Sequence, residues 1–114
     1  MSKHHKIDYI EWPAGDLGPV REFYAQAFGW GFVDYGPTYT ALSGAGLDGG
    51  FDADVTHATP KPLVILYSDN LEQSREAVIK AGGILTQDIF DFPGGRRFQF
   101  SDPSGNELGV WSDK

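Results

Sequence analysis

One order of predicted secondary-structure elements occurs twice in this sequence, and that repetition constrains the fold more than any other feature. Residues 7–12 alternate in polarity as a half-buried strand does. A helix pattern then starts at Asp16 and ends at Gly29, and three short strand candidates follow. The second half repeats this order, from the continuous apolar run at residues 63–67 to a closing hairpin at residues 96–111.

Overlaying the two halves with an offset of 69 − 16 = 53 residues places Asp16 on Asp69 and Gly29 on Gly82. A supersecondary unit that recurs at a fixed offset predicts two units that share one core. We therefore expect an α+β fold built from two βαβββ modules, at about residues 6–52 and 62–112, within a single domain of residues 1–114. In the first helix, an apolar stripe at helical spacing predicts a face that packs on the core: Val20, Phe23, Tyr24 and Ala27.

The closing hairpin turns at the run Asp102-Pro103-Ser104-Gly105-Asn106, whose residue types favour a tight turn. Period-2 alternation assigns one apolar face to Phe98, Phe100, Leu108 and Val110. The other face carries Arg97, Gln99, Glu107 and Trp111. This mixture is typical of a solvated sheet face, and equally of the floor of a small-molecule cleft.

The charge balance narrows the class of partner. Nine Lys and Arg residues stand against sixteen Asp and Glu residues, so the net charge is 9 − 16 = −7, and the charges are dispersed. Nucleic acid is therefore not an expected partner, whereas a neutral or cationic small molecule is. The absence of cysteine excludes disulfides and thiol chemistry. No apolar run reaches the ~20 residues of a membrane span, and the N-terminus lacks the apolar core of a signal peptide, so we expect a cytoplasmic protein without membrane contact.

An ordered set of short motifs spans nearly the whole chain: Tyr9-Ile10-Glu11-Trp12-Pro13 with Asp16-Leu17, Phe23-Tyr24 with Phe28-Gly29-Trp30, Ala81-Gly82-Gly83, and Gly95-Arg96 before Asp102-Pro103-Ser104-Gly105-Asn106. Through this set the chain resembles the vicinal oxygen chelate superfamily of glyoxalase I, extradiol dioxygenases, and fosfomycin- and bleomycin-resistance proteins. It is most similar to small single-domain members related to lactoylglutathione lyase. The resemblance implies that the two modules form a curved, cup-like mixed sheet with helices on its outer face. It also implies a homodimer.

The resemblance further implies where metal-dependent members hold their cation. One ligand precedes the Asp of each helix start by seven residues, another follows the Asp-Pro turn by seven, and a fourth lies near the end of the fourth strand. Here these positions are Tyr9, Pro62, Gly109 and the region of Asp48. Proline and glycine have no side-chain donor atom, and a neutral phenol is a poor ligand, so we predict no metal and no cofactor. The histidines do not supply a substitute site, because His4 and His5 lie in an expected flexible tail and His57 in an expected loop.

If the geometry of the family carries over, strand alternation directs seven side chains into the cup as ligand-binding candidates: Tyr9, Glu11, Leu66, Arg97, Gln99, Glu107 and Trp111. The expected function is binding of a small aromatic or cationic organic molecule without a divalent metal. The alternative is a metal-free lyase or isomerase in which Glu11 is the catalytic general base and Tyr9 or Arg97 steadies an oxyanion. Two further readings remain open: an ordinary ion pair between Arg97 and Glu11 or Glu107, and a protein-interaction domain with no small ligand.

Overall fold

The computed structural model describes residues 3–54, 56 and 58–114, so His57 lies outside the described residues. The chain divides into two compact units. The N-terminal unit comprises Tyr9–Leu63, and the C-terminal unit comprises Val64–Lys114 together with the N-terminal residues up to Asp8. The division between 63 and 64 falls close to the predicted start of the second repeat. The sequence did not predict that residues 3–8 belong to the C-terminal unit.

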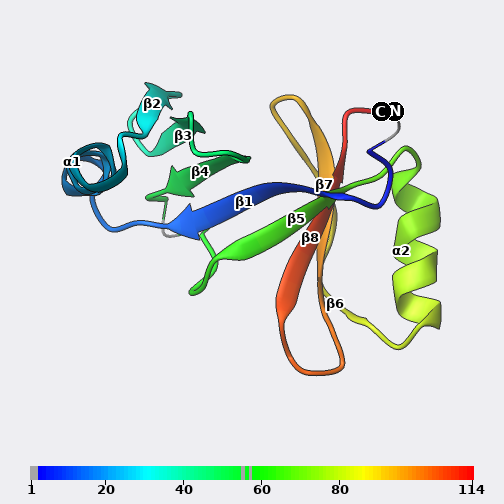
Figure 1. Ribbon diagram of the computed structural model, residues 1–114. Helices are drawn as coiled ribbons and strands as arrows, with labels where there is room; N and C mark the ends of the chain where they lie inside the picture. Colours follow the sequence, from blue (N-terminus) through cyan, green and yellow to red (C-terminus); the bar gives the residue numbers. More distant parts are fainter. Residues whose placement is uncertain (1–2, 55, 57) are drawn as a thin grey trace. The chain divides into compact units, whose positions relative to one another are not determined.

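The N-terminal unit carries one βαβββ module (Figure 1). Its elements are β1 (Ile7–Pro13, which begins in the other unit), α1 (Leu17–Phe28), β2 (Gly31–Asp34), β3 (Tyr39–Ser43) and β4 (Asp48–Asp52). The strand order is β2-β3-β4-β1, with antiparallel pairs up to β4 and a parallel pair between β4 and β1. The sheet is therefore mixed, as predicted.

The C-terminal unit repeats this topology. Its elements are β5 (Leu63–Tyr67, whose first residue belongs to the other unit), α2 (Leu71–Lys80), β6 (Ile84–Phe92), β7 (Gly95–Ser101) and β8 (Glu107–Ser112). The order β5-β8-β7-β6 has a parallel β5–β8 pair and antiparallel pairs beyond it. The predicted hairpin is confirmed, and its pairing keeps the two predicted faces, because Arg97 lies opposite Trp111 and Phe98 opposite Val110. The α+β fold class with two βαβββ modules is thus confirmed.

Each helix begins at a residue that caps it. The Asp16 carboxylate accepts the Gly18 N–H at 3.2 Å, and the Asn70 side chain accepts the Gln73 N–H at 3.1 Å. The helix α1 ends at Gly29, whose φ of 75° favours glycine. Of the apolar stripe predicted on α1, Val20 and Tyr24 are partly buried, but Phe23 and Ala27 are exposed. The stripe that packs is therefore narrower than predicted, and it includes Leu17, which is buried to 6% exposure.

Each unit has its own apolar core on the helix side of its sheet. In the C-terminal unit, Leu71 of α2 packs with Phe98 and Val110, and partly buried residues surround them: Leu66, Val78, Leu85, Ile89 and Phe100. In the N-terminal unit, the ring of Phe51 lies 5.2 Å from that of Trp12 and 5.3 Å from that of Tyr24. Burial of such side chains contributes about 1.5–3 kcal/mol each. Across the described ranges, no helix combines the length and apolarity that crossing a membrane requires.

The N-terminal residues are hydrogen-bonded, contrary to the expectation of a flexible tail. The His5 N–H donates to the Tyr67 carbonyl at 2.7 Å, and the Tyr67 N–H donates to the Lys6 carbonyl at 3.1 Å. The His4 Nδ1 accepts the Asp69 N–H at 2.8 Å, and the His5 Nε2 lies 2.8 Å from the Ser74 hydroxyl. Backbone pairing beside Tyr67 therefore orders this segment, and its lack of apolar residues had hidden that pairing from sequence reasoning.

Candidate functional site

The sheet of the N-terminal unit has one face on α1 and one face opposite to it. Trp12 and Phe51 pair in register and face the helix side. Alternation therefore places Glu11 and Tyr9 on the opposite face, Glu11 beside Gly50 and Tyr9 beside Asp48. Two of the predicted site residues thus share this face.

A third side chain reaches the same place from β3. The Tyr39 ring lies directly over Gly50, since a Cβ placed on that glycine would come within 2.4 Å of the Tyr39 hydroxyl oxygen. This hydroxyl is 2.5 Å from the Tyr9 hydroxyl and donates to Glu11 Oε2 at 3.0 Å. The absence of a side chain on β4 therefore allows a β3 residue to meet two β1 residues. We call Tyr9, Tyr39 and Glu11 the phenol–carboxylate cluster.

The chemistry of the cluster is set by Tyr39. Its burial, reinforced by the negative charge of Glu11, raises the pKa of the Tyr39 phenol far above its usual value of 10.0. Tyr39 therefore stays protonated at neutral pH and gives its single proton to the carboxylate, which is the stronger acceptor. The short contact with Tyr9 is then made by the Tyr9 proton. The donation runs from Tyr9 to Tyr39 to Glu11, and the negative charge lies at its end.

Sequence reasoning missed Tyr39. The signal that points to it is the pair Gly49-Gly50 inside a strand, since glycine in a strand interior often marks the close approach of another group. Gly49 meets the same condition, because a Cβ on it would lie 2.4 Å from the Ile10 carbonyl oxygen. The two glycines make opposite faces of β4 accessible to neighbouring groups.

In the C-terminal unit, four predicted site residues share the face opposite to α2. Arg97 lies opposite Trp111, Gln99 opposite Gly109, and Ser101 opposite Glu107. Glu107 Oε2 accepts from Gln99 Nε2 at 3.0 Å and from the Thr86 hydroxyl at 2.6 Å. Gln99 is 3% exposed, and within the described residues its Oε1 has no hydrogen-bond partner.

Aromatic rings lie beside the Arg97 guanidinium on this face. The Arg97 guanidinium lies 5.3 Å from the ring centre of Phe90 and 5.8 Å from that of Phe92. The Phe92 ring is 6.3 Å from that of Trp111. A cation held over ring faces at such distances contributes about 0.5–1 kcal/mol where solvent reaches it. The predicted ion pair of Arg97 with Glu11 or Glu107 stays a prediction.

The face predicted for Leu66 is wrong. Leu66 pairs with Val110 and packs against the core beneath α2, away from the face of Gln99 and Glu107. The error comes from the repeat offset, because the two helix caps, Asp16 and Asn70, are 70 − 16 = 54 residues apart rather than 53. A shift of one residue in a strand exchanges its two faces. Counted from the observed cap, the second metal-ligand position implied by the resemblance moves from Pro62 to Leu63.

The side chains at these family positions do not suit a divalent cation. The Tyr9 phenol is hydrogen-bonded to Tyr39, and Leu63 and Gly109 have no donor atom in their side chains. Asp48 contributes one carboxylate, which does not define a coordination geometry alone. Over residues 3–54, 56 and 58–114, no three His, Asp or Glu side chains gather as a metal site would require.

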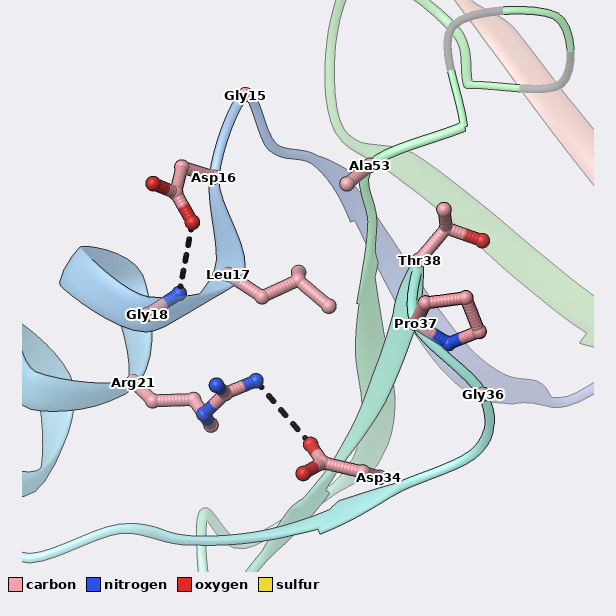
Figure 2. A pocket seen from close by; sticks show the side chains of 10 residues that line it. All are labelled: Gly15, Asp16, Leu17, Gly18, Arg21, Asp34, Gly36, Pro37, Thr38 and Ala53. Atoms are coloured by element: carbon pink, nitrogen blue, oxygen red, sulfur yellow. Dashed lines mark hydrogen bonds and ion pairs between the residues drawn. The ribbon is translucent and has the colours of Figure 1, made fainter.

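A separate polar hollow of about 430 Å³ lies where α1 begins, within the N-terminal unit (Figure 2). Arg21 and Asp34 face each other across it in an ion pair of 3.1 Å, and the Asp16 carboxylate is turned toward the Gly18 N–H. None of the predicted site residues lines this hollow. Its charged groups already serve a helix cap and an exposed ion pair, so it is not our candidate site.

Comparison with known proteins bears on both units. The family model described as the Glyoxalase/Bleomycin resistance protein/Dioxygenase superfamily matches residues 6–110. A search of curated protein sequences found no significant match. Among solved structures, the Mn(II)-bound glyoxalase from Novosphingobium aromaticivorans is similar with a TM-score of 0.69 and 21% identity, over 99% of this chain and 40% of that chain.

Two other similar structures match over nearly their full length. Methylmalonyl-CoA epimerase from Mycobacterium tuberculosis has a TM-score of 0.71 and 12% identity, over 98% of this chain and 91% of that chain. A glyoxalase/bleomycin resistance protein/dioxygenase superfamily member from Vibrio splendidus 12B01 has a TM-score of 0.70 and 12% identity, over 91% and 96% respectively. At these identities the likeness is one of fold. With a family model that matches almost the whole chain, it follows that this protein belongs to the glyoxalase/bleomycin resistance protein/dioxygenase superfamily.

Proposed function

We propose that this protein binds a small cationic or aromatic organic molecule at the phenol–carboxylate cluster, without a divalent metal. The observation that carries the proposal is the position of Tyr39 over Gly50, which joins two phenol rings to one carboxylate on a single sheet face. Phenol rings offer aromatic area and a negative ring face to a cation. The Glu11 carboxylate supplies the charge that fixes its orientation.

The direction of proton donation supports a ligand that carries hydrogen-bond donors. Both phenol protons of the cluster are used within it, Tyr9 toward Tyr39 and Tyr39 toward Glu11. The cluster therefore receives a cation or an N–H group better than it receives an anion. The net charge of −7 favours the same class of ligand through long-range attraction.

The alternative is a metal-free lyase or isomerase with Glu11 as general base. The observation that favours it is the hydrogen bond of 3.0 Å from the Tyr39 phenol, which holds the Glu11 carboxylate in one orientation on the sheet face, as a general base requires. Binding and catalysis differ in outcome. A bound molecule that mass spectrometry recovers unchanged supports the binding module, whereas turnover that Glu11→Gln abolishes supports the enzyme.

The binding proposal is tested by thermal shift and calorimetry with a matched panel of cationic, neutral and anionic aromatic molecules. We expect the cationic members to raise the melting temperature. We expect Glu11→Gln to weaken their binding by about tenfold or more, which corresponds to about 1.4 kcal/mol. The control Glu22→Gln changes an exposed carboxylate of α1 and should leave affinity unchanged. Equal affinity in Glu11→Gln, or a preference for anions, would refute the proposal.

The metal-free part of the proposal has its own test. Elemental analysis of protein purified without chelator should find no stoichiometric divalent metal. One equivalent of zinc, nickel, iron or manganese, lost in a Tyr9→Phe or Asp48→Asn variant, would contradict it. The homodimer and the cytoplasmic location stay predictions, and native mass spectrometry decides the first of them.

A further inference from the structure

The C-terminal unit holds one of its own cations on aromatic rings. The Lys3 Nζ lies 4.4 Å from the ring centre of Tyr67 and 5.2 Å from that of Trp111. The two rings meet nearly edge-on, at 74° and 5.2 Å between centres. Asp8 Oδ2 is 3.7 Å from the same nitrogen. All of these residues belong to the C-terminal unit.

Hydrogen bonds that do not involve Lys3 hold these groups in place. The Trp111 indole N–H donates to Asp8 Oδ2 at 2.9 Å, and the Tyr67 hydroxyl donates to Asp113 Oδ1 at 2.5 Å. The Tyr67 side chain is almost fully buried, at 4% exposure. Two rings and two carboxylates are therefore oriented before any cation arrives, and we call these four residues the cation cage.

Lys3 lies at the cage because residues 4–6, which we call the tether, are fixed beside Tyr67, and not because its own side chain is buried. Its side chain is 51% exposed, whereas that of Asp8 is 20% exposed. The tether is fixed by two backbone hydrogen bonds, one from the His5 N–H to the Tyr67 carbonyl and one from the Tyr67 N–H to the Lys6 carbonyl. Because the tether keeps the ammonium close, Lys3 has a high effective concentration at the cage. A solvated primary ammonium nevertheless gains little from the ring faces, because it remains strongly hydrated.

We propose that the cation cage is a binding site for organic ammonium groups, and that Lys3 is a built-in occupant which an external ammonium displaces. Alkylated ammonium groups are the best match, because they are weakly hydrated and make broad contact with ring faces. The carboxylates of Asp8 and Asp113 supply the countercharge. The site shares no residue with the phenol–carboxylate cluster and does not depend on the function proposed for it.

The probe for this site is tetramethylammonium, with tert-butanol as an uncharged molecule of similar size and sodium chloride at equal ionic strength. Binding is followed by NMR through the Trp111 indole N–H signal, which is assigned by its loss in Trp111→Phe. We expect a saturable shift with tetramethylammonium and none with the other two. We expect Lys3→Met to tighten binding at least about fivefold, because the tethered competitor is removed.

Matched variants make the test specific. Lys6→Met removes a charge from the same segment but not from the rings, and should leave the dissociation constant within about twofold of the wild-type value. Asp8→Asn keeps an acceptor for the indole N–H but removes the countercharge, and should weaken binding. Glu11→Gln should leave the Trp111 response unchanged, which separates this site from the phenol–carboxylate cluster. No saturable shift in Lys3→Met, an equal response to tert-butanol, or equal tightening in Lys6→Met would overturn the proposal.

Discussion

The ring of Tyr39 occupies the space in which a Gly50 side chain would lie, so that β3 contacts β1 across the strand between them. This contact assembles the phenol–carboxylate cluster from residues 28 and 30 positions apart in the chain. A missing side chain on one strand is thus as important to the cluster as the three side chains that form it.

Gly50→Ala should therefore disrupt the cluster. The added methyl group would lie 2.4–2.6 Å from Tyr39 ring and hydroxyl atoms, so the ring must move. We expect a loss of about 1–3 kcal/mol in the free energy of unfolding, measured in urea, as for other overpacked sites. Gly15→Ala is the control, because a methyl group there would have no atom within 4 Å. Equal stability of the two variants would contradict the described position of Tyr39.

Leu66→Ala should cost stability rather than ligand affinity. Leu66 packs against the Leu71, Phe98 and Val110 core, so its truncation should reduce the free energy of unfolding by about 2 kcal/mol or more. The control Ile84→Ala removes a side chain that is 70% exposed and should cost far less. Unchanged stability together with lost ligand binding would restore the face assignment that the sequence had suggested.

Asn70→Ala should destabilise the second helix. Its side chain accepts the Gln73 N–H, and loss of such a cap costs about 1 kcal/mol. Asp69→Asn provides the comparison, because the Asp69 ion pair with Lys114 is exposed and such pairs contribute about 0–1 kcal/mol. If Asp69→Asn were the more costly change in chemical denaturation, the cap would be one residue earlier than the structure places it.

The stability of the protein should fall in alkali partly because of Tyr67. The hydrogen bond to Asp113 raises the pKa of the Tyr67 phenol from 10.0 to about 12. The unfolded chain therefore loses this proton first, so the contribution is complete below about pH 10 and disappears as pH rises to about 12. Tyr67→Phe should show a shallower loss of stability across this window in urea titrations. The exposed Tyr35→Phe serves as the control, and identical slopes in all three proteins would contradict the prediction.

Much of the architecture was accessible from sequence because it depends on local patterns. Alternation around the turn at Asp102 predicted the β7–β8 hairpin and its two faces, and capping residues with glycine ends predicted both helices. The sequence did not show which side chains of β5 point toward α2 and which point away from it. Its apolar run has no alternation, so its face rested on the repeat offset alone, and one residue of error in that offset exchanged Leu66 for its neighbours.

The candidate site was predictable only where its residues lie on one regular strand. Tyr9 and Glu11 on β1, and Arg97 and Gln99 on β7, share faces as alternation requires. Tyr39 was not predicted because its position depends on Gly50, which lies in a different strand. The pairing of the N-terminal residues with Tyr67 escaped because backbone hydrogen bonds leave no trace in side-chain patterns.

The unequal spacing within the two repeats limits how their sequences can be exchanged. The interval from helix cap to the following left-handed glycine is 29 − 16 = 13 residues in the first half and 82 − 70 = 12 in the second. Consider a chimera, or a duplicate of one repeat, whose sequence is aligned on these glycines. Its helix ends would match, but the strand before the helix would be shifted by one residue, so that its two faces would be exchanged. The strands of such proteins should therefore be aligned on the capping residues Asp16 and Asn70. The one-residue difference in length then falls between the cap and the glycine.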